Sequence, residues 1–575
     1  MGARPPRTQF SAPSRKTRTH RNFPSVRANF TRKRPGRACS PTSRFGFKAA
    51  VLASVVIFCL QTPAPAQYLD QIGVTLLRAT TTNLNGAGIR VAQAEAAAPA
   101  FEVNPAAVNQ PASLFTYFSA DGSTGGFPNS AGTESGHADG VGGYFYGLTG
   151  GVATNVVHVD NYDADYFFND VISATIPASI NAPVANQSFI FCNGDYSHFS
   201  SGMEQDIDSQ YDDYAARFKT LFISGAGNGG PTNQARVFPA ATCYNGLGVA
   251  AYGGSSCIGP TLDNGRCKPD ITAPADVTSF STPQVSGAAA ILMQAALRGD
   301  GGGDTNSACD IRTIKVLLLN GAVKPVNWTN STASPLDARY GAGVVNVFNA
   351  YEQLAGGKHN LISNEMISSG GAHPPGGSAG TVSSLNGWDF NSISSGGGGI
   401  FSPAQDGVNH YYFDVTNDSA NPTFTAAITL VWNRQQNQSA INNLDLFLYD
   451  CANGNLVMCS TSLVDNVEHI FLPELSPGRY DLQVLKNSAA AVSDGETYAL
   501  AWAFYSEKLS AQKSGANLIL RWPVYPAGFA LESATNLNPP NWSANNLPAP
   551  GVVNFQNVIS LDATNAARFF RLRQP

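Results

Sequence analysis

The chain has 575 residues, 43% of them hydrophobic, which is enough for about three or four domains with buried cores. Thirteen of its 35 Lys and Arg residues lie in the first 66 residues, which contain no Asp or Glu. The rest of the chain therefore has 22 Lys and Arg against 40 Asp and Glu, a formal net charge of −18. Such an acidic chain is a poor ligand for phosphate backbones, which argues against the nucleic-acid-binding classes.

The first 66 residues are predicted to be an export signal. Their basic stretch precedes a short apolar run at 49–60, and Ala64-Pro65-Ala66 follows that run. A basic flank, a short apolar core and small residues at the end are typical of a secretory signal peptide. The apolar run is too short to cross a bilayer comfortably, and no later run reaches that length. We therefore expect a secreted or periplasmic protein, cleaved near Ala66, with no membrane insertion.

Residues 67–357 are predicted to form an α/β domain with a mainly parallel sheet that helices cover on both faces. Apolar patterns predict strands at Gly88–Glu95, Val152–Asp160, Val184–Phe191 and Leu221–Ile223. They predict helices at Tyr68–Ala79, Asp206–Lys219 and Ile311–Asn320, and a closing helix that ends near Gly356. In folds of this class the chemistry lies at the carboxyl ends of the strands.

The most informative stretch begins at Thr278 and reads TSFSTPQVSGAAAILMQAAL. It predicts a turn that leads into a helix, with Ser279 at the helix start, where free N–H groups favour developing negative charge. Pro283 is expected in the first turn, where its missing N–H is not needed. Gly287 and the alanines after it would let the helix lie close to a sheet. A serine at a helix start is also an ordinary N-cap, so this motif alone leaves both interpretations open.

Three other polar residues follow predicted strand ends or turns of the same domain. Glu95 ends its strand, His137 lies in the glycine-rich segment GHADGVGG, and Asn228 lies in SGAGNGG. Each has an ordinary structural explanation: a surface carboxylate, a packed turn histidine and a turn residue with left-handed backbone. Their occurrence together, with Ser279, favours a catalytic site.

The motifs resemble those of the subtilisin-like serine proteases over residues 85–352. GAGIRVAQAE resembles the strand that ends in the catalytic acid, GHADGVGG the histidine turn and SGAGNGG the oxyanion loop. KPDITAP and TSFSTPQVSGAAA resemble the nucleophile segment, and YGAGVVNV resembles the closing motif. The order acid, histidine, serine is that of subtilisin. Several motifs in register are far more specific than any one of them.

The resemblance implies a role for each of the four polar residues. Ser279 Oγ would attack the scissile carbonyl, and His137 would take its proton and pass it to the leaving amine. Glu95 would hold the imidazole tautomer and stabilise its cation. The Asn228 side chain and the Ser279 backbone N–H would bind the oxyanion. No cofactor is expected to be obligatory.

Several departures from the family's pattern bear on activity. Glu95 stands where the family has Asp, so the strand must sit back by about 1.5 Å to keep the same contact. Val277 replaces a Gly and is expected to restrict the backbone. Ile190 replaces a Gly of the substrate-binding strand and is expected to narrow the cleft. The loop 275–277 is shorter than usual.

Two functions from different classes are therefore carried forward. The first is a secreted serine endopeptidase that hydrolyses peptide bonds in proteins through an acyl-enzyme on Ser279. The alternative, which the departures favour, is a catalytically inactive subtilisin-like scaffold that binds proteins or glycans through its β domains. Asp139 and Asp160 are the spare acids should Glu95 not contact His137, although neither lies on the matching motif.

Metal and disulfide sites are only weakly indicated. Asp160, Asp163, Asp165 and Asp170 form an acidic run that could hold structural calcium, although a solvated loop is the simpler interpretation. Seven cysteines follow residue 66, and their odd number leaves at least one thiol free or paired between chains. The candidate disulfides are Cys451–Cys459 across a hairpin and Cys257–Cys267 across a loop.

The C-terminal part of the chain is predicted to be all-β. Residues 358–386, which include SGGAHPPGGSAG, are expected to be a linker. Residues 387–505 contain alternating runs such as FTAAITLVW and GRYDLQVL between turn residues, which predicts a β-sandwich or jelly-roll domain. It looks like the β domains appended to secreted subtilisin-like proteases. Residues 506–575 are expected to form a separate small β module.

Overall fold

The structure is a computed structural model that describes residues 38–39 and 65–573. Short gaps fall at 98–99, 129–133, 194–195, 230–234, 379, 400–401, 417–422, 490–491, 506–508, 524–528, 554–555 and 563–567. Most of the predicted export signal, including the apolar run at 49–60, lies outside the described residues. Within the described part of the chain, no helix is long and apolar enough to cross a membrane.

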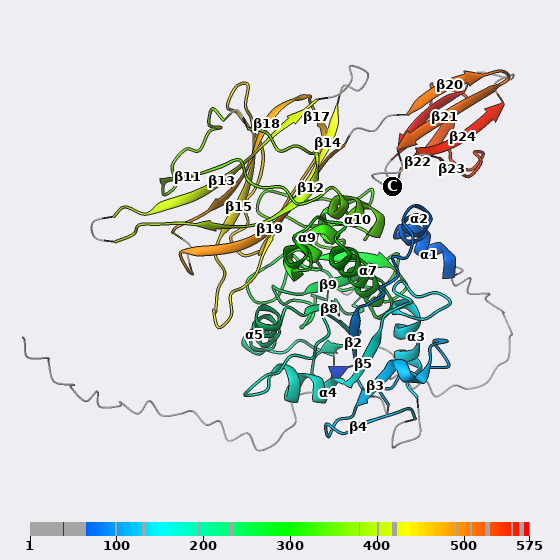
Figure 1. Ribbon diagram of the computed structural model, residues 1–575, viewed down its shortest axis with the longest axis vertical. Helices are drawn as coiled ribbons and strands as arrows, with labels where there is room; N and C mark the ends of the chain where they lie inside the picture. Colours follow the sequence, from blue (N-terminus) through cyan, green and yellow to red (C-terminus); the bar gives the residue numbers. More distant parts are fainter. Residues whose placement is uncertain are drawn as a thin grey trace, which may run out of the picture. The chain divides into compact units, whose positions relative to one another are not determined.

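An eight-stranded sheet organises the first half of the chain (Figure 1). Its strand order is β10-β9-β8-β6-β2-β5-β3-β4, and every neighbouring pair is parallel except β3–β4. The strands are β2 (Arg90–Glu95), β3 (Phe115–Phe118), β4 (Thr124–Gly125), β5 (His158–Asp163), β6 (Val184–Gln187), β8 (Leu221–Gly225), β9 (Leu247–Tyr252) and β10 (Ile271–Pro274). The central strands β6 and β8 are buried along their whole length, as expected of parallel strands covered on both faces.

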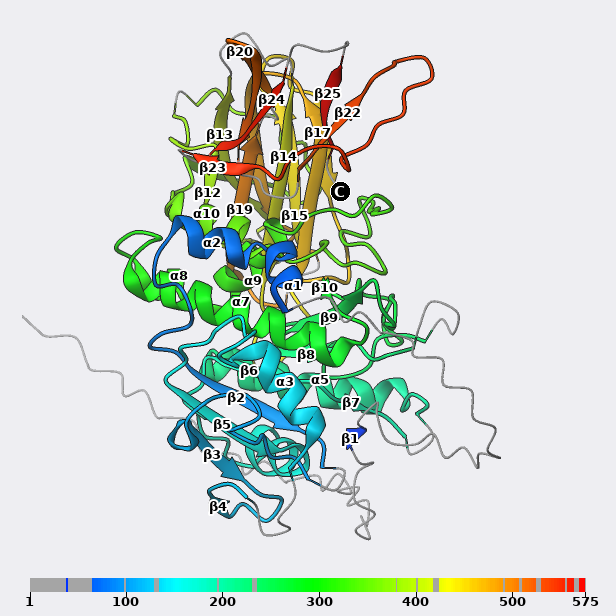
Figure 2. The same ribbon diagram turned by 90° about the vertical axis from the view of Figure 1, so that its right-hand side faces the viewer.

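Helices cover both faces of this sheet, as predicted (Figures 1 and 2). They are α1 (Pro65–Gln71), α2 (Val74–Thr80), α3 (Gly136–Phe145), α4 (Ala164–Tyr166), α5 (Ser201–Phe218), α7 (Thr278–Arg298), α8 (Thr305–Ala308), α9 (Ile311–Asn320) and α10 (Val347–Ala355). A 3-10 turn, η1 (Ala112–Leu114), and a π-helical turn, η2 (Phe167–Ile172), complete the set. Phe222 of β8 contacts Tyr211 of α5, whereas Gly225 of β8 faces Thr282 of α7. Residues 222 and 225 point to opposite faces of the strand, so α5 and α7 lie on opposite sides of the sheet.

Close packing of α7 depends on its small residues. A Cβ added at Gly287 would lie 2.5 Å from Val152 Cβ, so no larger residue fits there. Val152 was predicted to begin a strand, but that prediction is wrong. The strand begins at His158, which pairs with Arg90, because β2 offers no partner before that residue.

Two further strand predictions need correction. The predicted strand Val184–Phe191 is divided into β6 and β7 (Ile190–Phe191), and β7 lies outside the eight-stranded sheet. It pairs antiparallel with β1 (Ala38–Cys39). Strand β9 was not predicted, because its small residues gave no alternating pattern.

Residues 363–505 form the predicted sandwich of two antiparallel sheets. Their orders are β11-β13-β18-β15-β16 and β12-β19-β14-β17. The strands are β11 (Ser363–Ser368), β12 (Asn386–Ser394), β13 (Gln405–Val415), β14 (Phe424–Trp432), β15 (Leu444–Asp450), β16 (Leu456–Ser460), β17 (Val467–Leu475), β18 (Gly478–Lys486) and β19 (Gly495–Tyr505). Strand β11 lies in the region predicted to be a linker, so 358–386 is partly integral to the sandwich.

The C-terminal module has its own two sheets and its own apolar core. The strands are β20 (Ser510–Ser514), β21 (Asn517–Pro523), β22 (Ala530–Ala534), β23 (Gly551–Val553), β24 (Gln556–Asp562) and β25 (Phe569–Arg573). Leu520, Trp522 and Ile559 are among its buried residues. Four strands form the order β20-β21-β24-β23, and β22 pairs with β25. That these residues are a separate module stays a prediction.

Neither predicted disulfide is present: Cys257, Cys267, Cys451 and Cys459 are free thiols, so both pairings are wrong. In the hairpin, Cys459 lies opposite Phe447, whereas Cys451 lies in the turn beyond the last residue pair of β15. Because the two cysteines are out of register, they cannot bridge the hairpin. Cys257 packs in an apolar cluster, whereas the Cys267 N–H donates to Asp465 of the sandwich. The two cysteines therefore contact different parts of the chain.

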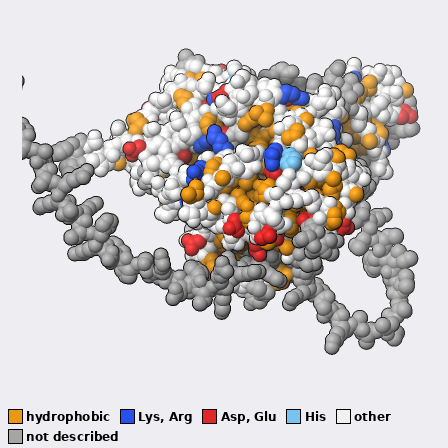
Figure 3. Space-filling view, turned by 60° about the horizontal axis from the view of Figure 1, so that its bottom comes forward, with side chains coloured by type: hydrophobic (Ala, Val, Ile, Leu, Met, Phe, Trp, Pro, Cys, Tyr) orange, Lys and Arg blue, Asp and Glu red, His pale blue; other side chains and the backbone are white. Residues whose placement is uncertain are grey.

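Charged side chains occur at several places on the surface of the protein. On the face shown in Figure 3, acidic side chains gather along one edge, and Lys and Arg side chains occur at separate places. Hydrophobic side chains occupy much of the middle of this face. The described atoms of this face form no continuous basic patch.

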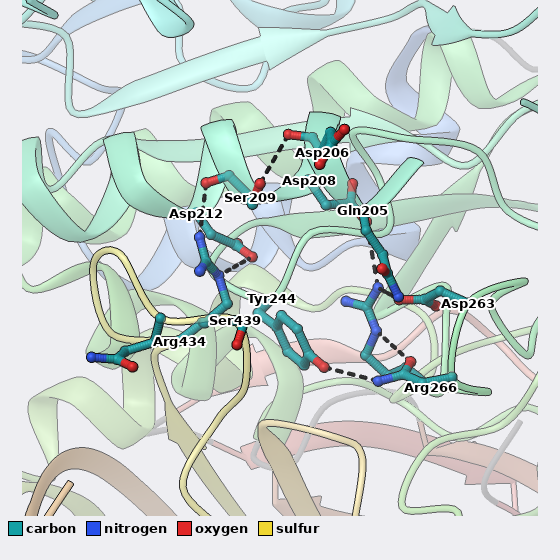
Figure 4. Close-up of a pocket in the computed structure, with 12 residues that line it drawn as sticks. Gln205, Asp206, Asp208, Ser209, Asp212, Tyr244, Asp263, Arg266, Arg434 and Ser439 are labelled. Carbon is teal, nitrogen blue, oxygen red and sulfur yellow. Dashed lines mark hydrogen bonds and ion pairs between the residues drawn. The ribbon is translucent and has the colours of Figure 1, made fainter. Parts of the chain in front are cut away.

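The sandwich shares a core with the α/β domain. Trp388, Val431 and Ala499 of the sandwich belong to the same buried cluster as α9 and α10. Arg434 extends from the sandwich to α5, where Nε donates to Asp212 at 3.1 Å and Nη2 to Asp213 at 2.6 Å. Arg434 and Asp212 line a pocket of about 200 Å³ (Figure 4).

Replacement of Arg434 by Ala is expected to destabilise the protein by about 3 kcal/mol or more, because it leaves the buried Asp212 carboxylate without its cation. Urea unfolding followed by tryptophan fluorescence measures this loss. Lys358→Ala is the control, because its ion pair with Asp304 is partly exposed and is worth about 1 kcal/mol or less. Equal losses in the two variants would contradict a stabilising role for the Arg434 contact.

Candidate active site

The predicted contact between the acid and the histidine is present. Glu95 is the last residue of β2, and His137 lies in the first turn of α3, whose N-cap Ser135 accepts a hydrogen bond from the Ala138 N–H. His137 Nδ1 lies 2.8 Å from Glu95 Oε2. An ionised carboxylate only accepts hydrogen bonds, so Nδ1 carries the proton and Nε2 is the free basic atom.

Burial and the charge of Glu95 have opposite effects on the pKa of His137. Burial lowers the pKa of the imidazole, and the charge and hydrogen bond of Glu95 raise it, with a net increase above the ordinary value. His137 Nε2 is buried and has no hydrogen-bond partner. No hydrogen bond therefore joins it to Ser279 in this structure, although such bonds often form only once substrate is bound.

Ser279 is the second residue of α7, and the N-cap of that helix is Val277. The interpretation of Ser279 as an N-cap is therefore wrong, and its hydroxyl is not needed to cap the helix. Val277 has φ −142° and ψ 155°, an extended conformation that any residue adopts, so the expected restriction at this position is wrong too. In this first turn the Phe280 N–H donates to the Val277 carbonyl at 3.1 Å and the Thr278 N–H to Asn228. Ser279 lies between them, where N–H groups lack the usual acceptor four residues earlier in the helix.

Pro283 lies inside α7 rather than in its first turn, contrary to the prediction. Its missing N–H leaves the carbonyl four residues earlier, that of Ser279, without a helical donor. Ser188, between β6 and β7, supplies the donor: its Oγ lies 3.0 Å from the Ser279 carbonyl oxygen. Sequence reasoning did not identify Ser188, although a proline four residues after the nucleophile indicates that such a donor is needed.

Asn228 follows β8, and Thr278 holds its side-chain amide through the oxygen atom. Its Oδ1 accepts from the Thr278 backbone N–H at 2.9 Å and from Thr278 Oγ1 at 2.8 Å. Nδ2 is buried without a hydrogen-bond partner. The left-handed position of this loop is Gly227 with φ 100°, so the interpretation of Asn228 as a left-handed turn residue is wrong.

The residues next to Ser279 fix its surroundings. Thr278 binds Asn228, and the Phe280 ring stacks near the His137 ring with centroids 6.2 Å apart. The two chain neighbours of Ser279 thus contact Asn228 and His137, whose Nδ2 and Nε2 atoms are both buried without a hydrogen-bond partner. A serine, a histidine with a free ring nitrogen and an amide with free N–H groups are the groups that a serine nucleophile, a general base and an oxyanion donor require.

Ile190 occupies the region beside the Asn228 loop. Its side chain is buried in an apolar cluster with Ala226, Phe238 and Cys257. The Cys257 N–H donates to the Gly227 carbonyl at 2.7 Å, which ties this cluster to the loop. The expectation that Ile190 narrows a substrate cleft stays a prediction.

The two spare acids have other partners. Asp139 accepts a hydrogen bond from the Asn104 backbone N–H at 2.6 Å, and burial raises its pKa to about 6. Asp160 binds Arg90 through both carboxylate oxygens, at 2.6 Å each. Neither carboxylate replaces Glu95 at the His137 ring.

The acidic run is not a loop, although Asp165 in α4 and Asp170 in η2 are exposed to solvent as expected. Asp160 and Asp163 lie within β5, and Asp163 caps α4 by accepting from the Asp165 and Tyr166 N–H groups. Among the residues that the structure describes, no group of three or more His, Cys, Asp or Glu side chains is arranged to hold a metal ion.

Comparison with known proteins places this site in a family. Residues 119–343 match the model of the subtilase family, Peptidase_S8, a segment that includes His137, Asn228 and Ser279. The chain contains a subtilase-family domain. Glu95 lies before the matched segment of this subtilase domain, so its assignment rests on its contact with His137.

Several solved protease structures are similar to the chain. A mutant of the protease domain of PatA is 20% identical and covers 48% of this chain and 98% of its own, with a TM-score of 0.32. A protease from Pseudoalteromonas arctica is 18% identical and covers 50% and 96%, with a TM-score of 0.32. Tripeptidyl peptidase 2 is 13% identical and covers 72% and 44%, with a TM-score of 0.28. No curated protein matches the chain.

Asn228→Ala is expected to lower kcat of the subtilase domain by about 10²- to 10³-fold with little change in KM, because the Nδ2 donor acts on charge that develops after binding. Steady-state hydrolysis of a fluorogenic peptide measures both constants. Asn228→Asp tests the N–H donor alone, because a carboxylate still accepts the hydrogen bond from Thr278 but has no N–H group to donate to the oxyanion. Retention of kcat in that variant would contradict the donor role.

Proposed function

We propose that the subtilase domain is a serine endopeptidase and that the protein acts outside the cytoplasm. The observation that carries the enzymatic part is the pair of buried, unpaired atoms, His137 Nε2 and Asn228 Nδ2, on residues that contact the chain neighbours of Ser279. Buried polar atoms are rarely left unpaired, and an active site is one place where they are retained for a reacting partner. Export is supported by the basic and apolar pattern of the first 66 residues.

The proposed reaction proceeds through an acyl-enzyme. Ser279 Oγ attacks the peptide carbonyl while His137 Nε2 takes its proton, and Glu95 stabilises the resulting imidazolium. Asn228 Nδ2 and the Ser279 N–H bind the oxyanion. His137 then donates the proton to the leaving amine, and a water molecule, activated in the same way, releases the acid. These steps use protein groups and water, so protein or peptide substrates are the partners proposed and no cofactor is included.

Labelling of the purified full-length protein with a fluorophosphonate probe tests this proposal. We expect covalent modification of Ser279, located by peptide mapping, because only an activated serine reacts with such a probe at a useful rate. Heat-denatured protein is the control for nonspecific reaction. If the folded protein stays unlabelled, the inactive scaffold that binds proteins or glycans through its β domains is the better explanation. The buried Ile190 beside the site is the observation that favours that alternative.

A further inference from the structure

A chain of buried polar groups continues from Glu95 away from His137. Gln93 lies two residues before Glu95 on β2, so both side chains point to the same face of the sheet. Gln93 Nε2 donates to Glu95 Oε1 at 2.9 Å and to the Ala138 carbonyl at 3.1 Å. The Tyr146 hydroxyl donates to Gln93 Oε1 at 2.6 Å. Gln93 and Tyr146 are both completely buried.

The orientation of the Gln93 amide is fixed from both ends. Its Oε1 accepts from Tyr146, and its NH₂ group faces a carboxylate and a carbonyl, which only accept. Burial raises the pKa of Tyr146 well above its ordinary value, so the hydroxyl stays protonated and remains a donor. An inverted amide would place an oxygen against the Glu95 carboxylate and break three hydrogen bonds.

The hydrogen bond from Gln93 restrains the carboxylate of Glu95, whose side chain is longer than that of aspartate. Glutamate has one more rotatable bond than the aspartate usual in the family, so one contact to the histidine leaves its carboxylate less well fixed. Gln93 holds Oε1 while Oε2 faces His137 Nδ1. Because Gln93 also binds the carbonyl of Ala138, the residue after His137, it connects the acid to the helix that carries the imidazole.

We propose that Gln93 is a positioning residue that holds Glu95 in the geometry that reaches His137, and that Tyr146 fixes the Gln93 amide for this task. This inference rests on the proposed function of the site. It explains how the chain uses glutamate as the acid of its triad. The other titratable groups that interact with Glu95 are Asp139 and Tyr146. Tyr117 in turn interacts with Tyr146, and Glu134 with Asp139.

The test compares Gln93→Met with wild type in the full-length protein. Methionine keeps the length of the side chain but makes none of the three hydrogen bonds. We expect kcat to fall by roughly 10- to 100-fold with KM nearly unchanged. A small displacement of the acid slows the chemical step but leaves the affinity for substrate unchanged. The acidic limb of the pH profile should move to lower pH, since a displaced Glu95 raises the His137 pKa less.

A double-mutant cycle separates positioning from general destabilisation. In a Glu95→Gln background, Gln93→Met should lower kcat by less than about twofold, because its effect passes through the Glu95 carboxylate. Gln353→Met is the matched control: Gln353 is a buried amide that accepts from Asn320 in the α10 region. It should lower the unfolding midpoint and leave the pH profile in place.

Two further measurements keep the inference testable if Gln93→Met folds poorly or if the protein is inactive. Tyr146→Phe removes one hydroxyl and should shift the profile in the same direction by a smaller amount. NMR titration of His137 in a Ser279→Ala background needs no turnover, and Gln93→Met should lower the measured pKa. A titration and a pH profile that both stay unchanged in Gln93→Met would overturn the proposal, whereas failure of peptide hydrolysis alone would count only against the proposed function.

Discussion

Ser279→Ala is expected to lower kcat for peptide hydrolysis by about 10⁶-fold, because it removes the atom that forms the acyl-enzyme. The fold should be unaffected, since the helix is capped at Val277 and the Ser279 hydroxyl makes no capping bond. Active-site titration and hydrolysis of a fluorogenic peptide measure the loss, and circular dichroism checks the fold.

Ser286→Ala is the matched control for this variant. Ser286 is also buried in α7, and its hydroxyl contacts Asn186 Oδ1 at 2.9 Å and the Thr282 carbonyl at 3.1 Å. Its loss should cost about 1 kcal/mol of stability and leave kcat within a few-fold of wild type. Residual hydrolysis above about one-hundredth of the wild-type rate in Ser279→Ala would place the nucleophile elsewhere.

Glu95→Gln is expected to lower kcat by about 10⁴-fold, the second-largest effect. The surrounding contacts explain why. The Gln93 NH₂ group would attract the oxygen of the new amide and turn its N–H groups toward His137 Nδ1. The imidazole would then keep its proton on Nε2, which is the wrong tautomer for a general base.

The same variant should change the protonation of His137 in a defined direction. Glu95 raises the His137 pKa, and burial lowers it, so removal of the charge leaves the lowering effect of burial. In wild type, active neutral imidazole forms only as pH rises through the raised pKa; in Glu95→Gln the titration should move to lower pH. NMR titration of His137 measures this shift. Glu95→Asp is the control, because it retains the charge and should retain the Nδ1–H tautomer and part of the rate. An unchanged His137 pKa in Glu95→Gln would exclude Glu95 as the acid.

Local pattern was sufficient for most secondary structure. The bounds of helix α9 and the end of the closing helix were predicted within one residue, because each has a helical apolar period and a clear stop. The strand that ends at Glu95 was predicted for a similar reason, since a buried apolar run stops at a carboxylate. The sandwich followed from alternation of apolar and polar residues.

Errors arose where a segment's partner lies far along the chain. Val152 is in an apolar run that suits a strand, but it packs against Gly287 of α7, more than a hundred residues later. Strand β11 has few apolar residues, and its pairing with β13 makes it a strand. No pattern within either segment contains that information, because strand pairing depends on the order of the sheet.

The sequence by itself determined which residue types are available for chemistry: a strand-terminal acid, a histidine, an asparagine and a serine in the order of a known family. The tertiary structure decided how they are used. It placed His137 against Glu95, fixed the Asn228 amide through Thr278, and replaced the donor that Pro283 lacks with Ser188. It also placed Gln93 behind Glu95. The physical reason is that hydrogen bonds between side chains depend on distances of about 3 Å between elements, which only the packed sheet and helices establish.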